Sequence, residues 1–155
     1  MGAVPSGPIT LGAPYTFLRV PPPQHFTLEK ANEALAEVRP LAERMVAHRR
    51  EVATLLSRRA DLTSTIAGNG GDLDPGELAR VEAEIAEEAK GVAQCVNRIH
   101  GLGAQVKDAD EGLVDFPALR EGEEVLLCWK LGEDEIAFWH GLEDGFAGRR
   151  PVDEL

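Results

Sequence analysis

Two long segments of this chain repeat apolar residues at intervals of three and four positions, and a glycine-rich segment separates them. Such spacing places the apolar side chains on one face of an α-helix. The separating segment, GNGGD at residues 68–72, favours a chain reversal, because glycine and asparagine readily adopt positive φ. The pattern therefore predicts an antiparallel helical hairpin over residues 27–102, about 40 Å long at the helical rise per residue. The first stripe is Leu28, Ala31, Leu35, Val38, Ala42, Met45, Val52, Leu56 and Ile66, and the second is Leu78, Val81, Ile85, Val92, Cys95, Ile99 and Leu102.

Both helix starts carry sequence signals. Thr27 is placed to cap the first helix. The second helix has Asp74 as its cap, Pro75 at the first helical position and Glu77 three residues after the cap, which is a variant of the capping box. Pro40 falls inside the first stripe, where proline removes a backbone donor and clashes with the preceding turn. We therefore expect a kink or a short break near Pro40.

The segment after the hairpin favours strands. EVLLCWKL and EIAFWH are dense in strand-forming residues and flank a short GED connection, which predicts a β-hairpin. LVDF, just before Pro117, is expected to be a third strand at the sheet edge, where proline is tolerated. The expected pairs are Leu131 with Glu135, Trp129 with Ala137 and Leu127 with Trp139, with Leu126 near His140.

These elements predict an α+β fold, in which a long helical hairpin packs on a small C-terminal antiparallel β-meander. The chain of 155 residues is about the length of one domain. We expect this domain to span residues 25–155, with the hairpin at 27–102, the meander at 105–142 and a C-terminal tail at 143–155. Residues 1–24 are rich in proline and glycine and are expected to form a disordered extension.

The charge and cysteine content narrow the classes of partner. A net charge of −11 would repel nucleic acid phosphates and anionic lipid. Two widely spaced cysteines form neither a metal knuckle nor a disulfide scaffold. The sequence also lacks a signal peptide pattern and an apolar run long enough to span a membrane. We therefore expect a cytoplasmic protein that binds no nucleic acid and no membrane.

Several segments resemble a known family. They are HFTLEKANEAL, EVRPLAERM, GFAGRRP and above all VKDADEGLVDFPALREGEEVLLCWKLGEDEIAFWH. Together they closely resemble the bacterial proteins grouped as the uncharacterised DUF2203 family, over about residues 25–152. The resemblance implies a small bacterial cytosolic protein. It implies no activity and supplies no catalytic residues.

Acidic residues and one histidine in the C-terminal third suggest a metal site. The candidate ligands are Asp108, Asp110, Asp115, Glu133 and His140, of which we select Asp115, Glu133 and His140. Carboxylates with one imidazole suit divalent ions such as Mn, Fe, Zn or Mg. The alternative is that the acids form a solvated surface and that His140 is a hydrogen-bonded histidine at a strand end.

The sequence allows two roles for each of the other candidate side chains in this region. Trp129 and Trp139 line either a ligand pocket or, as we favour, a core or subunit interface. Cys128 is either a nucleophile or, as we favour, a buried inert thiol. Arg149 and Arg150 form either a site for an anion or partner, or a solvated pair that binds nearby carboxylates.

Two functions of different classes follow. We favour a non-catalytic interaction or scaffold protein that binds an unknown protein partner and forms a homodimer, because two hairpins could bury their outer apolar stripes in a four-helix arrangement. The alternative is a divalent-metal-binding protein or metal-dependent hydrolase, in which Asp115, Glu133 and His140 hold an ion that activates water.

Overall fold

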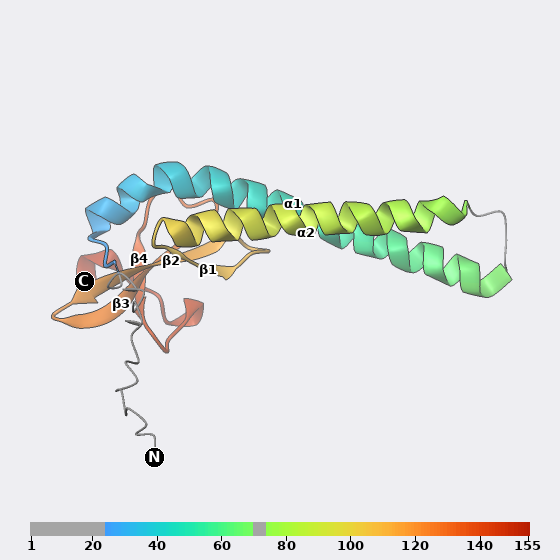
Figure 1. The fold of residues 1–155 in the computed structure, drawn as a ribbon. Helices are drawn as coiled ribbons and strands as arrows, with labels where there is room; N and C mark the ends of the chain where they lie inside the picture. The colour runs from blue at the N-terminus through green and yellow to red at the C-terminus, as the bar shows by residue number, and fades with distance from the viewer. Residues whose placement is uncertain (1–23, 70–73) are drawn as a thin grey trace, which may run out of the picture.

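The computed structural model describes residues 24–69 and 74–155 and has the predicted α+β architecture (Figure 1). Two long helices form an antiparallel hairpin that lies across one face of a five-stranded antiparallel meander, in the order β1-β2-β3-β4-β5. The elements are α1 (Leu28–Asn69), α2 (Pro75–Gly101), β1 (Gln105–Asp108), β2 (Leu113–Arg120), β3 (Glu123–Lys130), β4 (Phe138–Gly141), η1 (Phe146–Gly148), β5 (Arg150–Pro151) and η2 (Val152–Glu154). The extension expected at residues 1–24 lies outside the described residues except for Gln24, and so does most of the turn expected at 68–72.

The predicted caps start both helices. The Thr27 hydroxyl accepts a hydrogen bond from the Lys30 backbone N–H at 3.1 Å, at the start of α1. The Asp74 carboxylate accepts one from the Gly76 N–H at 2.9 Å, with Pro75 at the first position of α2. Each cap satisfies a backbone donor that has no partner within the helix. Both helices of the hairpin therefore begin where the sequence predicts.

Pro40 lies inside α1 and does not divide it, because one helix runs from Leu28 to Asn69. Figure 1 shows that α1 changes direction in its blue-to-cyan part, where Pro40 lies, in agreement with the expected kink. The helix continues because Val38 and Leu41, on either side of Pro40, are both buried against the rest of the fold. Burial of the flanking turns offsets the hydrogen bond that proline cannot donate.

The β3–β4 register is confirmed where strand pairing exists. Leu127 pairs with Trp139, and Leu126 pairs with His140. The other two expected pairs, Trp129 with Ala137 and Leu131 with Glu135, do not form, because β4 begins only at Phe138.

The connection from β3 to β4 is longer than expected because α1 holds it. Arg39 donates hydrogen bonds to the backbone carbonyls of Glu133 and Asp134, at 3.0 and 2.6 Å. Asn32 accepts one from the Ile136 N–H at 2.9 Å. These backbone groups therefore bond to the helix, so they are not available to a two-stranded ladder.

The segment LVDF was predicted to be an edge strand, and this prediction is wrong. It is the start of β2, which pairs with both β1 and β3. Proline is tolerated within β2 because pairing with β1 stops at Asp115. Beyond that point the Pro117 carbonyl accepts a hydrogen bond from the Phe26 N–H at 2.7 Å. The edge of β2 at Pro117 therefore needs no donor.

The sheet also extends past residue 142. β5 pairs with β4 through Phe138 with Pro151 and Trp139 with Arg150. Part of the segment expected as a tail is therefore a fifth strand.

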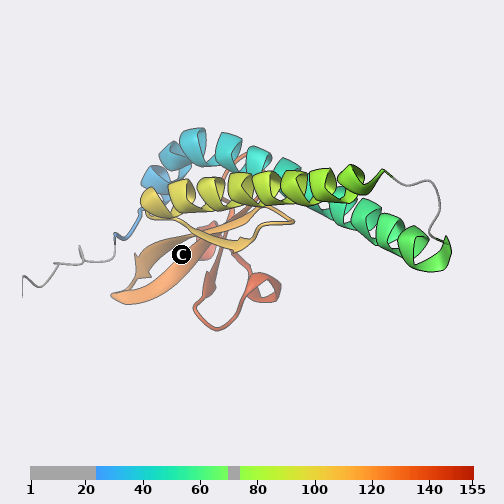
Figure 2. The same ribbon diagram turned by 45° about the vertical axis from the view of Figure 1, so that its right-hand side comes forward.

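The main core lies between the base of the hairpin and one face of the sheet (Figures 1 and 2). Most of the predicted stripe on α1 is buried there, but Leu56 and Ile66 are 39% and 48% exposed. Both follow the last buried residue of α1, Leu55, on the part of the hairpin that projects past the sheet. The periodicity placed them correctly on a helix but could not show where the sheet ends. The buried residues of this core are Phe26, Ala31, Leu35, Val38, Leu41, Ala42, Met45, Cys95, Ile99, Ala104, Val114, Phe116, Ala118, Val125, Leu127, Trp129, Ile136 and Trp139.

Gly112, in the turn before β2, generates a stability prediction. Its φ is +67°, and a Cβ there would lie 2.7 Å from the Leu131 Cβ. Gly122 has a similar φ of +87° but open space around it. We expect Gly122→Ala to cost about 1 kcal/mol of backbone strain, and Gly112→Ala to cost about 3 kcal/mol because overpacking is added. Urea unfolding of both variants measures the difference, and equal costs would show that the close approach of Leu131 is unimportant.

Candidate functional site

Three buried side chains with ionisable groups meet on the face of the sheet that points away from the helices. Asp115 on β2 lies directly across from Cys128 on β3, and His140 on β4 pairs with Leu126, two residues before Cys128. Their neighbours Val114 and Trp129 belong to the core under the helices. Because side chains alternate along a strand, the three residues occupy the opposite face.

The cluster is buried and close-packed. The His140 Nε2 atom lies 3.1 Å from the Asp115 Oδ2 atom, and the two side chains are only 4% and 2% exposed. One donor atom from each of Asp115, Cys128 and His140 lies within 4.8 Å of the other two. The second carboxylate oxygen, Asp115 Oδ1, is buried and has no hydrogen-bond partner among the residues that the structure describes. Such an atom is costly unless something else interacts with it.

The hydrogen bonds of His140 fix its tautomer. Its Nδ1 atom lies 2.8 Å from the Gly141 carbonyl oxygen. A carbonyl can only accept, so Nδ1 carries the hydrogen, and in a neutral imidazole Nε2 then presents a lone pair. This lone pair faces the Asp115 carboxylate, which is also an acceptor. The arrangement therefore requires a positive charge between them, either an additional proton or a metal cation.

The Cys128 thiol is held in its uncharged form in the metal-free protein. Burial, followed by the negative charge of Asp115, raises the pKa of Cys128 to about 12. A reactive cysteine needs a lowered pKa and access to solvent. Cys128 has neither, which favours the inert thiol over the nucleophile.

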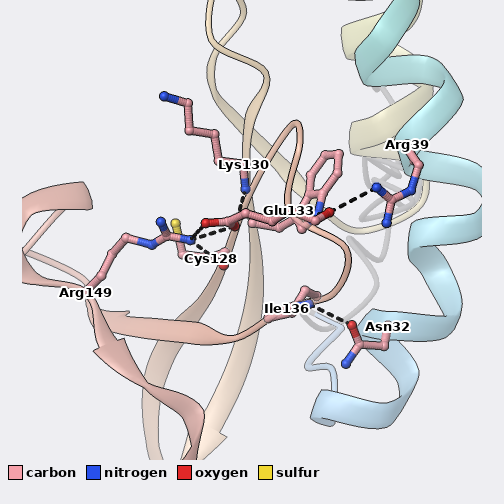
Figure 3. Close-up of polar contacts among 8 residues, drawn as sticks. Asn32, Arg39, Cys128, Lys130, Glu133, Ile136 and Arg149 are labelled. Atoms are coloured by element: carbon pink, nitrogen blue, oxygen red, sulfur yellow. Dashed lines mark hydrogen bonds and ion pairs between the residues drawn. The ribbon is translucent and has the colours of Figure 1, made fainter.

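Glu133 is engaged elsewhere (Figure 3). Its carboxylate accepts hydrogen bonds from Arg149 Nη2 and from the Lys130 N–H, both at 2.8 Å. Its backbone carbonyl accepts from Trp129 Nε1 at 2.9 Å and from Arg39 Nη1 at 3.0 Å. Glu133 therefore links three parts of the fold, which are β3, α1 and the segment that follows β4.

Of the expected metal ligands Asp115, Glu133 and His140, the structure brings together only Asp115 and His140. Cys128 is the third member of the cluster instead of Glu133. From the sequence, Cys128 was expected to be a buried inert thiol or a nucleophile and not a metal ligand, because the register of β2 against β3 was not predicted. The signal that could have found it is the antiparallel register that sets Cys128 across from Asp115.

The other two acidic candidates lie at the end of β1, for Asp108, and in the turn that follows it, for Asp110. The Asp108 carboxylate accepts hydrogen bonds from the N–H groups of Asp110 and Glu111. Asp110 pairs with Arg49 of α1 at 2.7 Å, and this hydrogen bond lowers the pKa of Asp110. Both residues therefore have protein partners at the turn.

Two aromatic rings and one carboxylate contact the Arg149 guanidinium, although its Nε atom is buried and has no hydrogen-bond partner among the described residues. The group lies 4.2 Å from the ring centroid of Phe138 and 4.7 Å from that of Phe146. It also pairs with Glu133 at 2.8 Å. A guanidinium neutralised in this way is not free to bind an anion.

Both tryptophans lie in the core. Trp129 is fully buried and Trp139 is 4% exposed. Arg150, the second arginine of the expected pair, lies 5.3 Å from the Trp139 ring centroid. The Trp139 Nε1–H donates to the Pro151 carbonyl at 3.1 Å. The tryptophans therefore contribute packing, and their polar groups are satisfied within the chain.

A second candidate surface is the part of the hairpin beyond the sheet, which we call the arm and define as residues 52–69 of α1 and 74–90 of α2. Figures 1 and 2 show it projecting past the sheet, with the two helices diverging toward the tip. Among its described residues only Val52, Leu55 and Val81 are buried. The arm therefore has very little core of its own.

One ion pair crosses the arm. Arg58 Nη2 of α1 lies 2.6 Å from a carboxylate oxygen of Glu77. Glu77, expected to complete a capping box on α2, thus links the two helices.

The chain matches the model of one protein family over residues 24–152. The family is described as "Uncharacterized conserved protein (DUF2203)", a description that names no activity. The chain has no significant match among curated proteins or solved structures. Within residues 24–69 and 74–155, no helix combines the length and apolar content needed to cross a membrane.

The raised pKa of Cys128 predicts an alkaline loss of stability in the metal-free protein. Above the ordinary thiol pKa of 9.0 the unfolded chain ionises, while the native thiol stays protonated up to about pH 12. The contribution of Cys128 to the free energy of unfolding is fully present below pH 9 and should therefore be lost as the pH rises toward 12. In Cys128→Ser the fall in stability with pH should be shallower, whereas Cys95→Ser, at the other buried cysteine, should behave like the unmodified chain. Urea unfolding in chelator at about pH 8 and about pH 10.5 tests this, and an unchanged fall in Cys128→Ser would contradict it.

Proposed function

The chain belongs to the DUF2203 family, whose description names no activity, and we propose that it is a non-catalytic interaction protein that pairs with a second copy of itself through the arm. One observation carries this proposal. The apolar face of the hairpin that packs on the sheet continues along the arm, where no described part of the chain covers it.

Helical spacing identifies this face. Leu56 follows the buried core residue Met45 by eleven positions, and Ile85 precedes Val92, which packs against the core, by seven. Residues at these intervals share one face of a helix. Leu56 is 39% exposed and Ile85 is half-buried. The core-forming face is thus continuous with an uncovered apolar face on the arm.

The charge of the chain limits where a second copy could bind. Two molecules with a net charge of −11 repel each other. The positions one heptad further along the arm, Thr63 and Leu78, are uncharged like Leu56 and Ile85. The stripe itself is therefore uncharged, with Glu82 and Glu88 one helical turn to either side of Ile85 at its margin.

Symmetry indicates how the copies would pair. In a twofold dimer the same patch is used on both subunits, so an uncharged apolar face is self-complementary. Antiparallel arms place the two sheets at opposite ends, where they do not collide. The result is a four-helix bundle in which each hairpin covers the open face of the other.

The hydrolase considered from the sequence has less support. It requires Asp115, Glu133 and His140 around one ion, but Arg149 and the Lys130 N–H hold the Glu133 carboxylate. The remaining members of the cluster are almost fully buried, which gives a substrate no access through the described residues.

The arm proposal predicts a dimer that a charge on the apolar face disrupts. We expect light scattering during size exclusion to show a concentration-dependent dimer, and Leu56→Glu and Leu56→Glu/Ile85→Glu to weaken it at least tenfold, because a carboxylate would be buried between the arms. Leu56→Glu alone keeps the test valid if the double variant unfolds, since Leu56 is already exposed in the chain.

The matched control is Ser57→Glu/Ala86→Glu. Each of these exposed residues directly follows a test position and therefore points about 100° away around its helix. The control variant adds the same charge as the test variant but outside the proposed interface, so the dimer should remain. A chain that is monomeric at every concentration, or equal weakening by both pairs of substitutions, would overturn the proposal.

A further inference from the structure

We propose that Asp115, Cys128 and His140 bind one transition-metal ion of the Zn²⁺ class. The inference is independent of the arm and concerns the opposite face of the sheet. It depends on which atoms face one another in the cluster, on their burial and on their chemical type.

The first argument is that the cluster has three acceptor atoms, the two Asp115 oxygens and His140 Nε2, but only one weak donor, the Cys128 thiol. With its hydrogen on Nδ1, His140 presents the Nε2 lone pair to Asp115 Oδ2 at 3.1 Å. The Cys128 sulfur lies in the same group of atoms. A cation at the centre interacts favourably with all three, because each atom can donate an electron pair to a metal.

The second argument is that a proton leaves part of the cluster unexplained. A proton shared by Asp115 and His140 would satisfy Oδ2 and Nε2. It would leave Oδ1, which is buried and makes no hydrogen bond of good geometry among the described residues, with no donor nearby except the weak Cys128 thiol. A metal ion can bind a carboxylate through one or both oxygens. The unpartnered oxygen therefore favours a metal over a proton.

The donor set selects the class of metal. One thiolate, one imidazole and one carboxylate suit Zn²⁺, Co²⁺ or Fe²⁺, whereas Mg²⁺ and Ca²⁺ prefer oxygen ligands alone. Bonds of about 2.0 to 2.3 Å in a tetrahedral Zn²⁺ site place ligand atoms roughly 3.3 to 3.8 Å apart. The Nε2 to Oδ2 distance of 3.1 Å is already close to this, and all three donors lie within 4.8 Å. Small side-chain movements would complete the geometry.

The surroundings of His140 fit a ligand histidine. Histidines that bind a metal through one nitrogen usually donate the other N–H to a carbonyl or carboxylate. Here the acceptor is the Gly141 carbonyl, and the Gly141 N–H in turn donates to Asp144 Oδ2 at 3.1 Å. This turn keeps the Nε2 lone pair directed at the cluster.

Binding would convert the Cys128 thiol to a thiolate. The sulfur–metal bond forms, the S–H bond breaks, and the proton passes to solvent. Three ligands from the chain leave one position of a tetrahedral ion for water. Because the ligands come from β2, β3 and β4, the ion would hold these strands together.

The test uses the full-length chain, purified without an affinity tag. After metal removal by a chelator, one equivalent of Zn²⁺ or Co²⁺ is added, and bound metal is measured by mass spectrometry after buffer exchange. We expect one ion per chain, a higher unfolding temperature with Zn²⁺, and a thiolate-to-cobalt charge-transfer absorption with Co²⁺. Mg²⁺ should give no such stabilisation.

The variants Asp115→Asn, Cys128→Ser and His140→Gln should each lower the affinity for the metal ion more than about 100-fold. Loss of a group that only supports a metal ligand lowers the affinity by about 10- to 100-fold, and loss of the ligand itself should cost more. The matched controls are Cys95→Ser, at the second buried cysteine, and Glu133→Gln, at the carboxylate paired with Arg149. Both should retain the metal, and Cys95→Ser should retain the cobalt absorption.

Two results would overturn the proposal. One is a wild-type chain that takes up neither ion and has the same unfolding temperature with and without Zn²⁺, which would leave a shared proton as the cation. The other is metal uptake that Cys128→Ser and Cys95→Ser affect equally. Because the wild-type measurements need no substitution, the test remains decisive even if a ligand variant fails to fold.

Discussion

The fold depends on the packing of a long helical hairpin on a shorter sheet. α1 has 42 residues and α2 has 27, but the core formed with the sheet uses α1 only as far as Met45 and α2 only from Val92. At the base the apolar faces of both helices are covered, and the helices in turn bury one face of the meander. Past the sheet the same face continues without a cover (Figure 1). Burial of apolar surface is the main favourable contribution to folding, so this difference in length is what makes the arm a surface for assembly.

The second face of the sheet is buried at its centre without a helix to cover it. β2 and β3 are buried on both faces over their central residues, although the helices cover only one. Away from the helices, the aliphatic core is replaced by an acid, a thiol and an imidazole. Buried polar groups are tolerated when they are paired, and an unpaired carboxylate oxygen is expensive. A bound cation explains why such a group occupies the middle of the sheet. The pair formed by Glu133 and Arg149 instead anchors the long β3–β4 connection and the segment before β5 (Figure 3).

Much of the fold could be predicted because its signals are local. Helical periodicity and the caps Thr27 and Asp74 defined the hairpin, and the short GED connection between two strand-forming segments gave the pairing of Leu127 with Trp139. The errors came from contacts between distant parts of the chain. Nothing near Pro117 indicates that Phe26 will pair beside it, and nothing near Glu133 indicates that Arg149 will hold its carboxylate. The site was predicted only in part for the same reason. Its members lie on three strands, so their meeting depends on registers that local patterns do not determine.

The most direct test of the metal site is X-ray absorption at the zinc edge on the Zn²⁺-loaded chain, because it identifies the atoms bound to the ion. We predict one sulfur at about 2.3 Å and nitrogen or oxygen ligands at about 2.0 to 2.2 Å, in four-coordinate geometry. Sulfur scattering would come from Cys128 and should disappear in Cys128→Ser. A first shell of oxygen and nitrogen atoms alone would contradict the account, because it would place the ion outside the cluster of Asp115, Cys128 and His140.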